Sequence, residues 1–442
     1  MIGSLSHRYV IVGCGVAGLA AAQTIRRADP SGSIAIVSED PFGYYSRPGL
    51  AFYLTGEIPE ESLYPISKAD LKSLRLNWIV DRVTRLEPAQ HRILLEKKGT
   101  MGYDRLLVAT GSVAAMPPVP GIDLEGVVKL DSLEDARRIL QLSRRAKTAV
   151  VVGGGITALE LVEALTARKV KVQFLLRGDH YWSSVLDESE SLIVEDRLRD
   201  EGVILFPRTE LAAIEGDHGR VHSLTTQDGR TLQADMVGVA IGIRARKELA
   251  EAAGLITERG ILVDAGLRTS QADIFAAGDV AQVYDPLTGA YVLDSLWGPA
   301  REMGRTAGMN MSGAELVYTK SPSFNVTRLS GLTTTIIGMV GREVEADLVG
   351  LTHGDAEIWR QVPDAIVAQN NFDVNHLRLQ VGRETLLGAV LIGDQTLSEP
   401  LQNLILSRAN ILPVREELLA CQQDLPQLLA NFWMEWRRTH AA

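Results

Sequence analysis

Two glycine-rich turns, each between a β-branched apolar segment and an Ala/Leu-rich segment, constrain the fold of this chain more than any other feature. The first turn follows residues 9–12 and reads Gly13-Cys14-Gly15-Val16-Ala17-Gly18. The second follows residues 149–152 and reads Gly153-Gly154-Gly155-Ile156-Thr157-Ala158. This order is typical of a buried strand that turns tightly into a helix. The sequence therefore predicts an α/β fold with two βαβ units.

Each turn also has the chemistry of a phosphate site. Glycine lets the backbone approach a pyrophosphate, and the N-terminus of the next helix presents unpaired N–H groups and a partial positive charge. A lone glycine turn is weak evidence. The first one, however, is followed by a predicted strand at 33–37 and then by Glu39, whose carboxylate can hold both ribose hydroxyls of an adenosine. Two such turns predict two bound dinucleotides.

Composition narrows the class of protein. A chain of 442 residues is too long for one ordinary domain, and 46% hydrophobic with 23% charged residues is typical of a soluble globular protein. No uninterrupted apolar run reaches the roughly 18 residues that a membrane helix needs. The formal net charge of −10 argues against a nucleic-acid binder, which needs a basic face.

The two cysteines, Cys14 and Cys421, form neither a disulfide framework nor a C-x-x-C pair. We interpret both as structural and expect a reducing cytoplasm as the location. His7 and Arg8 precede an apolar run at 9–22 and imitate a secretory signal. That interpretation leaves the spaced glycines and the strand at 33–37 unexplained.

The ends of two further predicted strands add candidate residues to the first site. Ala109-Thr110-Gly111 ends a predicted buried strand at 103–108, and Gly278 with Asp279 ends another at 273–277. Both ends are expected at the carboxyl edge of the sheet that carries the first turn. An aspartate there can bind the ribityl hydroxyls of a flavin nucleotide.

Together these motifs resemble the two-dinucleotide-fold flavoprotein reductases, the class of glutathione reductase, ferredoxin and rubredoxin reductases, NADH oxidases and the large subunit of assimilatory nitrite reductase. The resemblance is specific over residues 8–315 and looser over 320–400. It implies FAD in the first site, NAD(P)H in the second, and two Rossmann-like domains followed by a C-terminal α+β domain. The expected boundaries are 1–115 with 241–318 for the FAD-binding domain, 116–240 for the NAD(P)-binding domain and 319–442 for the C-terminal domain.

The segment Ser46-Arg47-Pro48 is similar to the Arg-Pro version found in rubredoxin, ferredoxin and nitrite reductase flavoproteins. Members that reduce disulfides or peroxide place cysteine in this region, and this chain has none there. The resemblance implies that Arg47 contacts the cofactor. It also places Trp297 at a helix start that faces the flavin pyrimidine, although packing in a core is an equal alternative.

In the second unit, related reductases have a glutamate beside the nicotinamide, which implies that role for Glu160. The alternative is a solvated carboxylate in the first helical turn, where it favours the helix dipole. NADH-selective members have an acid at the position of Leu176, whereas this chain has an apolar residue and then Arg177, which suits a 2′-phosphate. This favours NADPH, although a register shift would bring Asp179 to the ribose. The segment 242–245 lacks the proline of the usual Gly-x-x-Pro.

The complete set of implied site residues follows the order of the chain, with Glu160 and Arg47 as the catalytic candidates. No metal ligands are predicted, because His353 and His376 are isolated and have no ligand spacing. The implied cofactor-binding residues are Gly13, Gly15, Val16, Ala17, Gly18, Glu39, Asp40, Arg47, Pro48, Val83, Ala109, Thr110, Gly111, Gly153, Gly155, Ile156, Thr157, Glu160, Arg177, Gly242, Gly278, Asp279 and Trp297.

The resulting hypothesis is an NAD(P)H-dependent FAD oxidoreductase that passes electrons to a separate redox protein, such as a ferredoxin, a rubredoxin or a nitrite reductase, without a cysteine relay. One alternative is an NAD(P)H oxidase or quinone reductase. Another is a flavin-binding interaction protein whose partner surface is switched by reduction. Near the C-terminus, residues 425–436 place apolar side chains on one helical face, which predicts packing on the same domain or in a homodimer, or else docking to a redox partner or membrane.

Overall fold

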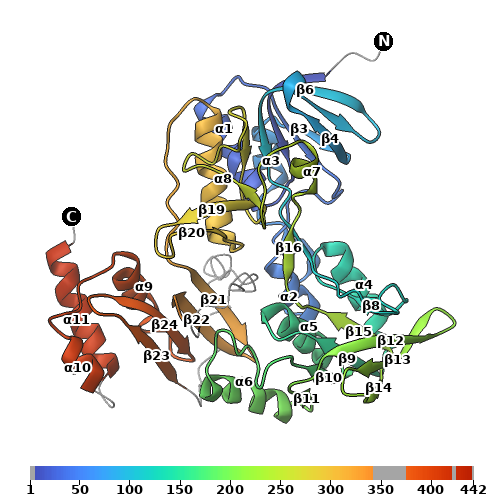
Figure 1. Cartoon of the computed structure of the whole chain (residues 1–442), viewed down its shortest axis with the longest axis vertical. Coiled ribbons are helices and arrows are strands. Elements are labelled where there is room, and N and C mark those ends of the chain that lie inside the picture. The colour runs from blue at the N-terminus through green and yellow to red at the C-terminus, as the bar shows by residue number, and fades with distance from the viewer. Residues whose placement is uncertain (1–4, 342–374, 421–424, 441–442) are drawn as a thin grey trace.

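The computed structural model describes residues 5–341, 375–420 and 425–440. Figure 1 shows three lobes: one built from the N-terminal segment together with α8 (Trp297–Met311), one from the middle of the chain, and one from the C-terminal segment. The α/β fold expected from the two glycine turns is confirmed, and both turns lie between a parallel strand and a helix.

The first lobe is built on a seven-stranded sheet in the order β3-β2-β1-β6-β5-β4, with β18 also pairing β6. Ile274 of β18 pairs in parallel with Leu106 of β6, so a late segment of the chain returns to the first sheet. The strands are β1 (Leu5–Val12), β2 (Ile34–Ser38), β3 (Asn77–Val80), β4 (Val83–Glu87), β5 (Arg92–Leu95), β6 (Gly99–Val108) and β18 (Ile274–Ala276).

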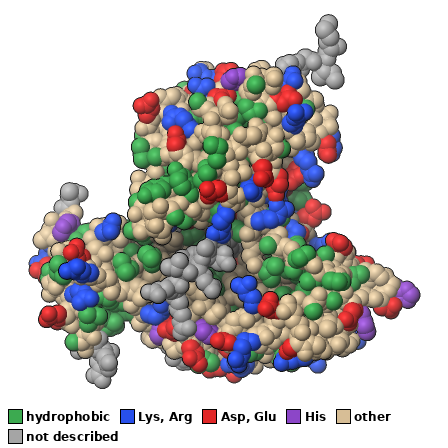
Figure 2. Space-filling view, viewed as in Figure 1, with side chains coloured by type: hydrophobic (Ala, Val, Ile, Leu, Met, Phe, Trp, Pro, Cys, Tyr) green, Lys and Arg blue, Asp and Glu red, His purple; other side chains and the backbone are tan. Residues whose placement is uncertain are grey.

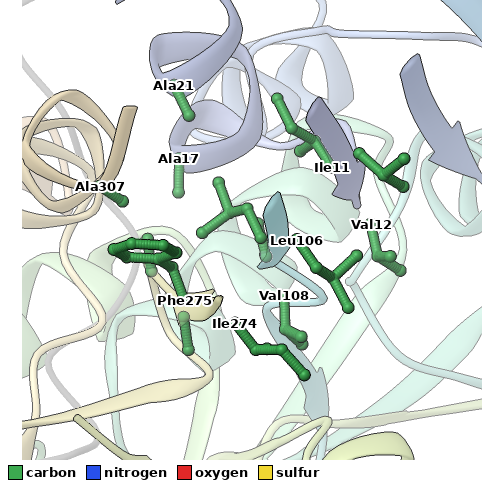
Figure 3. Packing of buried hydrophobic residues seen from close by; sticks show 14 of the residues in the cluster. Ile11, Val12, Ala17, Ala21, Leu106, Val108, Ile274, Phe275 and Ala307 are labelled. Carbon is green, nitrogen blue, oxygen red and sulfur yellow. The ribbon is translucent and has the colours of Figure 1, made fainter. Parts of the chain in front are cut away.

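Helices α1 (Val16–Ala28) and α8 lie side by side against this sheet, and small residues bring them close. Figure 3 shows Ala17 and Ala307 facing Leu106 and Phe275 across the core. A Cβ added at Gly304 of α8 would lie 2.2 Å from the Ala17 carbonyl oxygen. At Gly304 the two helices therefore pack backbone against backbone, without room for a further methyl group.

The second lobe has an all-parallel five-stranded sheet in the order β11-β10-β9-β15-β8. Its strands are β8 (Val127–Val128), β9 (Thr148–Val152), β10 (Lys171–Leu175), β11 (Ile204–Phe206) and β15 (Met236–Val239). The helices are α4 (Leu133–Ser143), α5 (Ile156–Ala167) and α6 (Glu188–Asp200), and an antiparallel meander adds β12 (Leu211–Asp217), β13 (Arg220–Thr226) and β14 (Thr231–Gln233).

The segments that join these two lobes pair with each other. Strand β7 (Ser112–Ala114) runs antiparallel to β16 (Ile243–Ala245) in a two-stranded sheet. The segment 242–245, which lacks the proline of the usual Gly-x-x-Pro, therefore contains a short strand. The proline-rich segment 115–119 has neither helix nor strand, as its composition predicts. Smaller elements of the first lobe are α3 (Lys68–Ser73), η2 (Pro88–Gln90), α7 (Glu248–Ala252), β17 (Ile261–Leu262), β19 (Ala281–Asp285) and β20 (Ala290–Leu293). Helix α2 (Gly49–Thr55) and η1 (Glu60–Leu63) come from the N-terminal segment but belong to the core cluster of the second lobe, where α2 packs against α4 and α5.

The third lobe is an antiparallel sheet in the order β21-β22-β24-β23, covered by helices. Leu429 of the last helix is fully buried in the cluster that contains Leu401 and Leu404, so the predicted apolar face of this helix packs on its own lobe. The elements are β21 (Phe324–Leu329), β22 (Leu332–Gly338), β23 (His376–Val381), β24 (Leu386–Ile392), α9 (Ser398–Leu406), α10 (Arg415–Ala420) and α11 (Leu425–His440).

Among the described residues, no helix is long and apolar enough to cross a bilayer.

Because α1 and α8 approach each other closely, we expect a substitution at one glycine of α8 to destabilise the protein. Replacing Gly304 with Ala should lower the free energy of unfolding by about 1–3 kcal/mol, because the new methyl group meets backbone. Gly298, in the first turn of the same helix, has nothing within 4 Å of an added Cβ, so Gly298→Ala is the matched control. Urea unfolding of both variants checks this, and equal stabilities would contradict it.

Candidate functional site

The first glycine turn is pressed against the neighbouring strand. A Cβ at Gly13 (φ +111°) would lie 2.1 Å from the Ala109 carbonyl oxygen, and a Cβ at Gly18 would lie 2.1 Å from the Gly13 carbonyl oxygen. A Cβ at Gly15, in contrast, would meet nothing within 4 Å. The two outer glycines therefore close the turn, and the middle one leaves the backbone open where α1 begins.

Helices α1 and α5 both start without a side-chain cap. Their N-cap residues are Gly15 and Gly155, and neither helix has an acidic residue in its first turn. Helices α4 and α6 instead begin with complete capping boxes, Ser132 with Asp135 and Asp187 with Glu190. The contrast leaves the first N–H groups of α1 and α5 free to bind an anion such as a pyrophosphate.

Asp279 lies at the end of β18, beside the first turn, as predicted. The Ser112 hydroxyl donates a hydrogen bond of 2.6 Å to its carboxylate, and a Cβ at Gly278 would lie 3.1 Å from the Ala17 Cβ. Burial raises the pKa of Asp279, and the positive charge of Arg47 opposes this. The structure thus brings Asp279, Arg47 and the turn together from distant parts of the sequence.

Unpartnered polar atoms mark the same region. The Ser295 hydroxyl and the Trp297 indole N–H are buried without a hydrogen-bond partner just before and at the start of α8. One Asp294 oxygen also lacks a hydrogen bond, but it lies 3.8 Å from the Lys320 Nζ in an ion pair. Trp297 is only partly buried, and the Arg301 guanidinium lies 5.1 Å from its ring centroid. Buried polar groups are normally hydrogen-bonded, so these atoms, with the open backbone at Gly15, fit a polar ligand such as FAD.

Glu39 and Arg47, both predicted to bind the cofactor, also have protein partners. Arg82 and Arg246 each donate a hydrogen bond of 2.9 Å to one Glu39 oxygen. Arg47 donates to the Asp131 carbonyl, which links the first lobe to the segment before α4. A ribose at Glu39 would therefore share the carboxylate with two arginines.

The other predicted residues of the first site lie around these groups. Asp40 accepts hydrogen bonds within its own turn, from the Phe42 N–H at 2.9 Å and the Tyr45 hydroxyl at 3.1 Å. Pro48 is the N-cap of α2, and Val83 begins β4 next to Arg82. Val16 and Ala17 open α1, and Ala109, Thr110 and Gly111 follow β6.

The second turn repeats the close approach of the first. A Cβ at Gly153 (φ +149°) would lie 2.1 Å from the Ala240 carbonyl oxygen. Arg177 is exposed two residues beyond β10, after buried Leu176, whereas Asp179 lies 3.4 Å from Arg208 in an ion pair. Ile156 and Thr157 open α5, and Gly242 (φ +120°) precedes β16.

Glu160 is half-buried on α5 and lies beyond the first turn of that helix. Burial, with a smaller contribution from the charge of Glu163, raises its pKa to about 8. Glu163 and the fully buried Tyr181 were not predicted. The sequence did contain a signal for Glu163: it is a second glutamate three residues after Glu160, on a helix whose buried positions are otherwise apolar.

Cys14 is buried, and its thiol donates to the Ser38 hydroxyl at 3.2 Å. Burial raises the pKa of this thiol to about 11, which disfavours the reactive thiolate and fits a structural role. Cys421 and His353 lie outside the described residues.

The prediction that His376 is isolated is wrong, because its Nε2 lies 3.1 Å from Glu190 of α6. These two residues and Asp187 have potential ligand atoms within 4.8 Å of one another. Arg378 already donates to Glu190 at 2.8 Å and lies 3.7 Å from Asp187. The cluster is therefore explained as an ion-pair contact between the third and second lobes.

On the face shown in Figure 2, acidic and basic side chains are interspersed, and no single sign of charge dominates it.

The fold and site define a class of protein with two dinucleotide-binding sheets. The pyridine nucleotide-disulphide oxidoreductase family model matches residues 7–302, and the chain belongs to this family. It is accordingly an oxidoreductase of the type that uses FAD and NAD(P)H.

Curated relatives and solved structures agree with this assignment. The chain is 36% identical over 280 residues, 61% of its own length and 66% of the relative's, to the biphenyl dioxygenase system ferredoxin--NAD(+) reductase component of Paraburkholderia xenovorans. It is 29% identical to the 3-phenylpropionate/cinnamic acid dioxygenase ferredoxin--NAD(+) reductase component of Photorhabdus laumondii, over 78% of this chain and 88% of that one. An NAD-dependent persulfide reductase from A. fulgidus superposes with a TM-score of 0.79 at 26% identity, covering 95% of this chain and 79% of that chain.

Removing the charge of Asp279 should weaken FAD binding. Asp279→Asn should raise the dissociation constant of FAD about tenfold to a hundredfold, the range expected for a lost hydrogen bond to a charged group. Ser112→Ala, which keeps the carboxylate, should have a smaller effect. The fluorescence of the flavin that dissociates on dilution measures this constant. If Asp279→Asn retains FAD as tightly as the wild type, a role of Asp279 in binding FAD is contradicted.

The environment of Cys14 predicts slow alkylation. At pH 8 the thiolate is about a thousandth of the thiol, and iodoacetamide labelling should accelerate about tenfold per pH unit up to about pH 10. Peptide mass spectrometry separates Cys14 from Cys421. Rapid labelling of Cys14 in the folded protein at pH 7 would show that its thiol is activated.

Proposed function

We propose that this protein takes electrons from NADPH through FAD and passes them to a separate redox protein. The observation that carries the proposal is the pair of uncapped helices, α1 and α5, each preceded by a glycine whose Cβ would lie 2.1 Å from a backbone oxygen. Both sites are built alike, and Asp279 with Arg47 accompanies only the first. This supports FAD at the first turn and the nicotinamide nucleotide at the second.

The cofactors supply the hydride chemistry, and the protein binds, orients and shields them. We assign the open backbone at Gly15 to the FAD pyrophosphate, Asp279 to the ribityl hydroxyls and the N-terminus of α8 to the pyrimidine edge. The partial positive charge of a helix N-terminus favours negative charge there. Glu160 is assigned to the nicotinamide, and its desolvated setting supports a role inside a water-poor site.

The proposed domains keep the predicted boundaries: 1–115 with 241–318 for FAD, 116–240 for the nucleotide and 319–442 for the C-terminal domain. The pairing of β7 with β16 supports this division, because the chain leaves and re-enters the first lobe through these two adjacent strands. Rotation of one lobe against the other would act on this two-stranded connection.

A protein acceptor is supported by two observations. Relatives named as ferredoxin reductase components match this chain over most of its length or theirs. The described cysteine, Cys14, is buried with a raised thiol pKa, so it does not offer a thiol route for electrons. A two-electron transfer to oxygen or a quinone is the alternative outcome.

The preference for NADPH rests on Arg177. Its exposed guanidinium follows a buried leucine at the end of β10, where a 2′-phosphate needs a cation. Both relatives are named for NAD(+), so the preference proposed for this chain has to be tested at Arg177 itself.

Anaerobic titration tests the function itself. The purified protein should contain FAD that is bleached by one equivalent of NADPH, and reoxidation by small iron–sulfur proteins should be faster than by quinones or oxygen. Fast oxygen turnover would favour an oxidase. Slow reoxidation by every acceptor, with a redox-dependent change of oligomer size, would favour a switched interaction protein.

Reversing the charge at position 177 tests the nucleotide preference. Arg177→Glu should lower the kcat/KM ratio of NADPH to NADH at least about tenfold, since a lost charge pair in a binding site costs more than about 1.4 kcal/mol. Arg144→Glu, an exposed change in the same lobe, should leave the ratio unchanged. An unaltered preference in Arg177→Glu would remove the phosphate role.

A further inference from the structure

A buried carboxylate of the second lobe lies against the segment that carries Arg47. Asp131 immediately precedes Ser132, the N-cap of α4, and its side chain is only 4% exposed. The Arg47 Nη2 donates a hydrogen bond to the Asp131 carbonyl and lies 3.8 Å from a carboxylate oxygen of the same residue. One nitrogen of the guanidinium is therefore held by two groups of a single residue from the other lobe.

The Asp131 carboxylate is itself fixed in place. The Ala114 N–H of β7 donates to both of its oxygens, at 2.8 and 2.9 Å, and the Lys129 ammonium donates to one of them. A buried polar network whose members all have partners is rigid. Asp131 is therefore a firm anchor for Arg47, and it ties this arginine to one of the two strands that join the lobes.

A second contact joins the same two segments. The Leu133 N–H, in the first turn of α4, donates a hydrogen bond of 3.0 Å to the hydroxyl of the buried Tyr45. That hydroxyl in turn donates to Asp40 at 3.1 Å. The segment before α2 is thus attached to the start of α4 at two points, through Tyr45 and through Arg47.

The rest of the Arg47 guanidinium is open to a ligand. The Arg47 side chain is 33% exposed. Within the described ranges, its Nη2 donates to protein, whereas its Nε and Nη1 have no protein acceptor. A guanidinium is planar and carries five N–H donors in a fixed fork, so holding Nη2 sets the direction of the other donors. Arg47 can therefore bind Asp131 and a cofactor at the same time.

We propose that Asp131 is a positioning residue for the flavin, which holds Arg47 by its Nη2 and so directs the remaining guanidinium donors to FAD. The proposal rests on the FAD site assigned to the first lobe under the proposed function. Asp131 needs no contact with FAD, because it acts through Arg47. A residue of the nucleotide-binding lobe thereby takes part in flavin binding by the other lobe.

Two single variants break the two ion pairs of this carboxylate separately. Asp131→Asn removes the charge that faces Arg47 but keeps a side-chain acceptor for the Ala114 N–H. Lys129→Met removes the other cation and leaves the Arg47 pair intact. Asp131→Asn should raise the dissociation constant of FAD about tenfold and Lys129→Met less than about twofold, since only residues of one network are strongly coupled. Equal weakening by both variants would indicate general destabilisation and overturn the proposal.

A double-mutant cycle tests whether Asp131 acts through Arg47. Arg47→Gln should weaken FAD binding at least as much as Asp131→Asn, and adding Asp131→Asn to Arg47→Gln should have no further effect. Additive effects would overturn the proposal.

Arg47→Lys keeps the proposal testable if Asp131→Asn does not fold. A lysine at this position keeps the charge that pairs with Asp131, but its single nitrogen cannot also serve FAD in the direction set by a guanidinium. Arg47→Lys should therefore weaken FAD binding about as much as Arg47→Gln. Wild-type affinity in Arg47→Lys would overturn the proposal.

The fluorescence of the flavin that dissociates when each holoprotein is diluted gives all of these constants. If the cycle is non-additive but neither NADPH nor NADH reduces the bound flavin, the positioning role stands and the proposed function fails. If a nucleotide reduces the flavin and the cycle is additive, the positioning role fails and the proposed function stands. If the purified protein binds no FAD, both fail.

Discussion

Both nucleotide-type sites depend on the absence of a side chain at one position. At Gly13 and Gly153 a Cβ would lie 2.1 Å from the carbonyl oxygen that ends the neighbouring strand, Ala109 in one sheet and Ala240 in the other. Any other residue would push the turn away from the sheet edge. The helix N-terminus would move with it, and the free N–H groups would lose their place above the strand ends.

What surrounds this repeated turn differs between the lobes, and so does the proposed ligand. The first turn has a buried carboxylate, Asp279, and an arginine, Arg47, that arrive from distant segments. The second has the desolvated glutamates of α5 and an exposed arginine after β10. Contacts between lobes include buried charged groups, as between Arg378 and the fully buried Glu190. Removing one partner of such a pair typically costs about 3–5 kcal/mol.

The sequence predicted the structural features that depend on the local spacing of residues. Strand-turn-helix order placed β1 with α1 and β9 with α5, and the rule for parallel strands placed Asp279 near the first turn. It did not predict partners that depend on lobe packing. Glu57 and Arg328 are 271 residues apart, and nothing in either segment's periodicity points to the other. The same holds for His376, which looked isolated because its partner, Glu190, lies in another lobe.

The most direct test of the two-site account compares the middle glycines of the turns. Gly15→Val should fold, because nothing lies within 4 Å of its Cβ, yet lose FAD. Gly155→Val should keep FAD that dithionite bleaches and NADPH does not. If Gly15→Val retains FAD, or if Gly155→Val is reduced by NADPH as fast as the wild type, the assignment of one dinucleotide to each turn is contradicted.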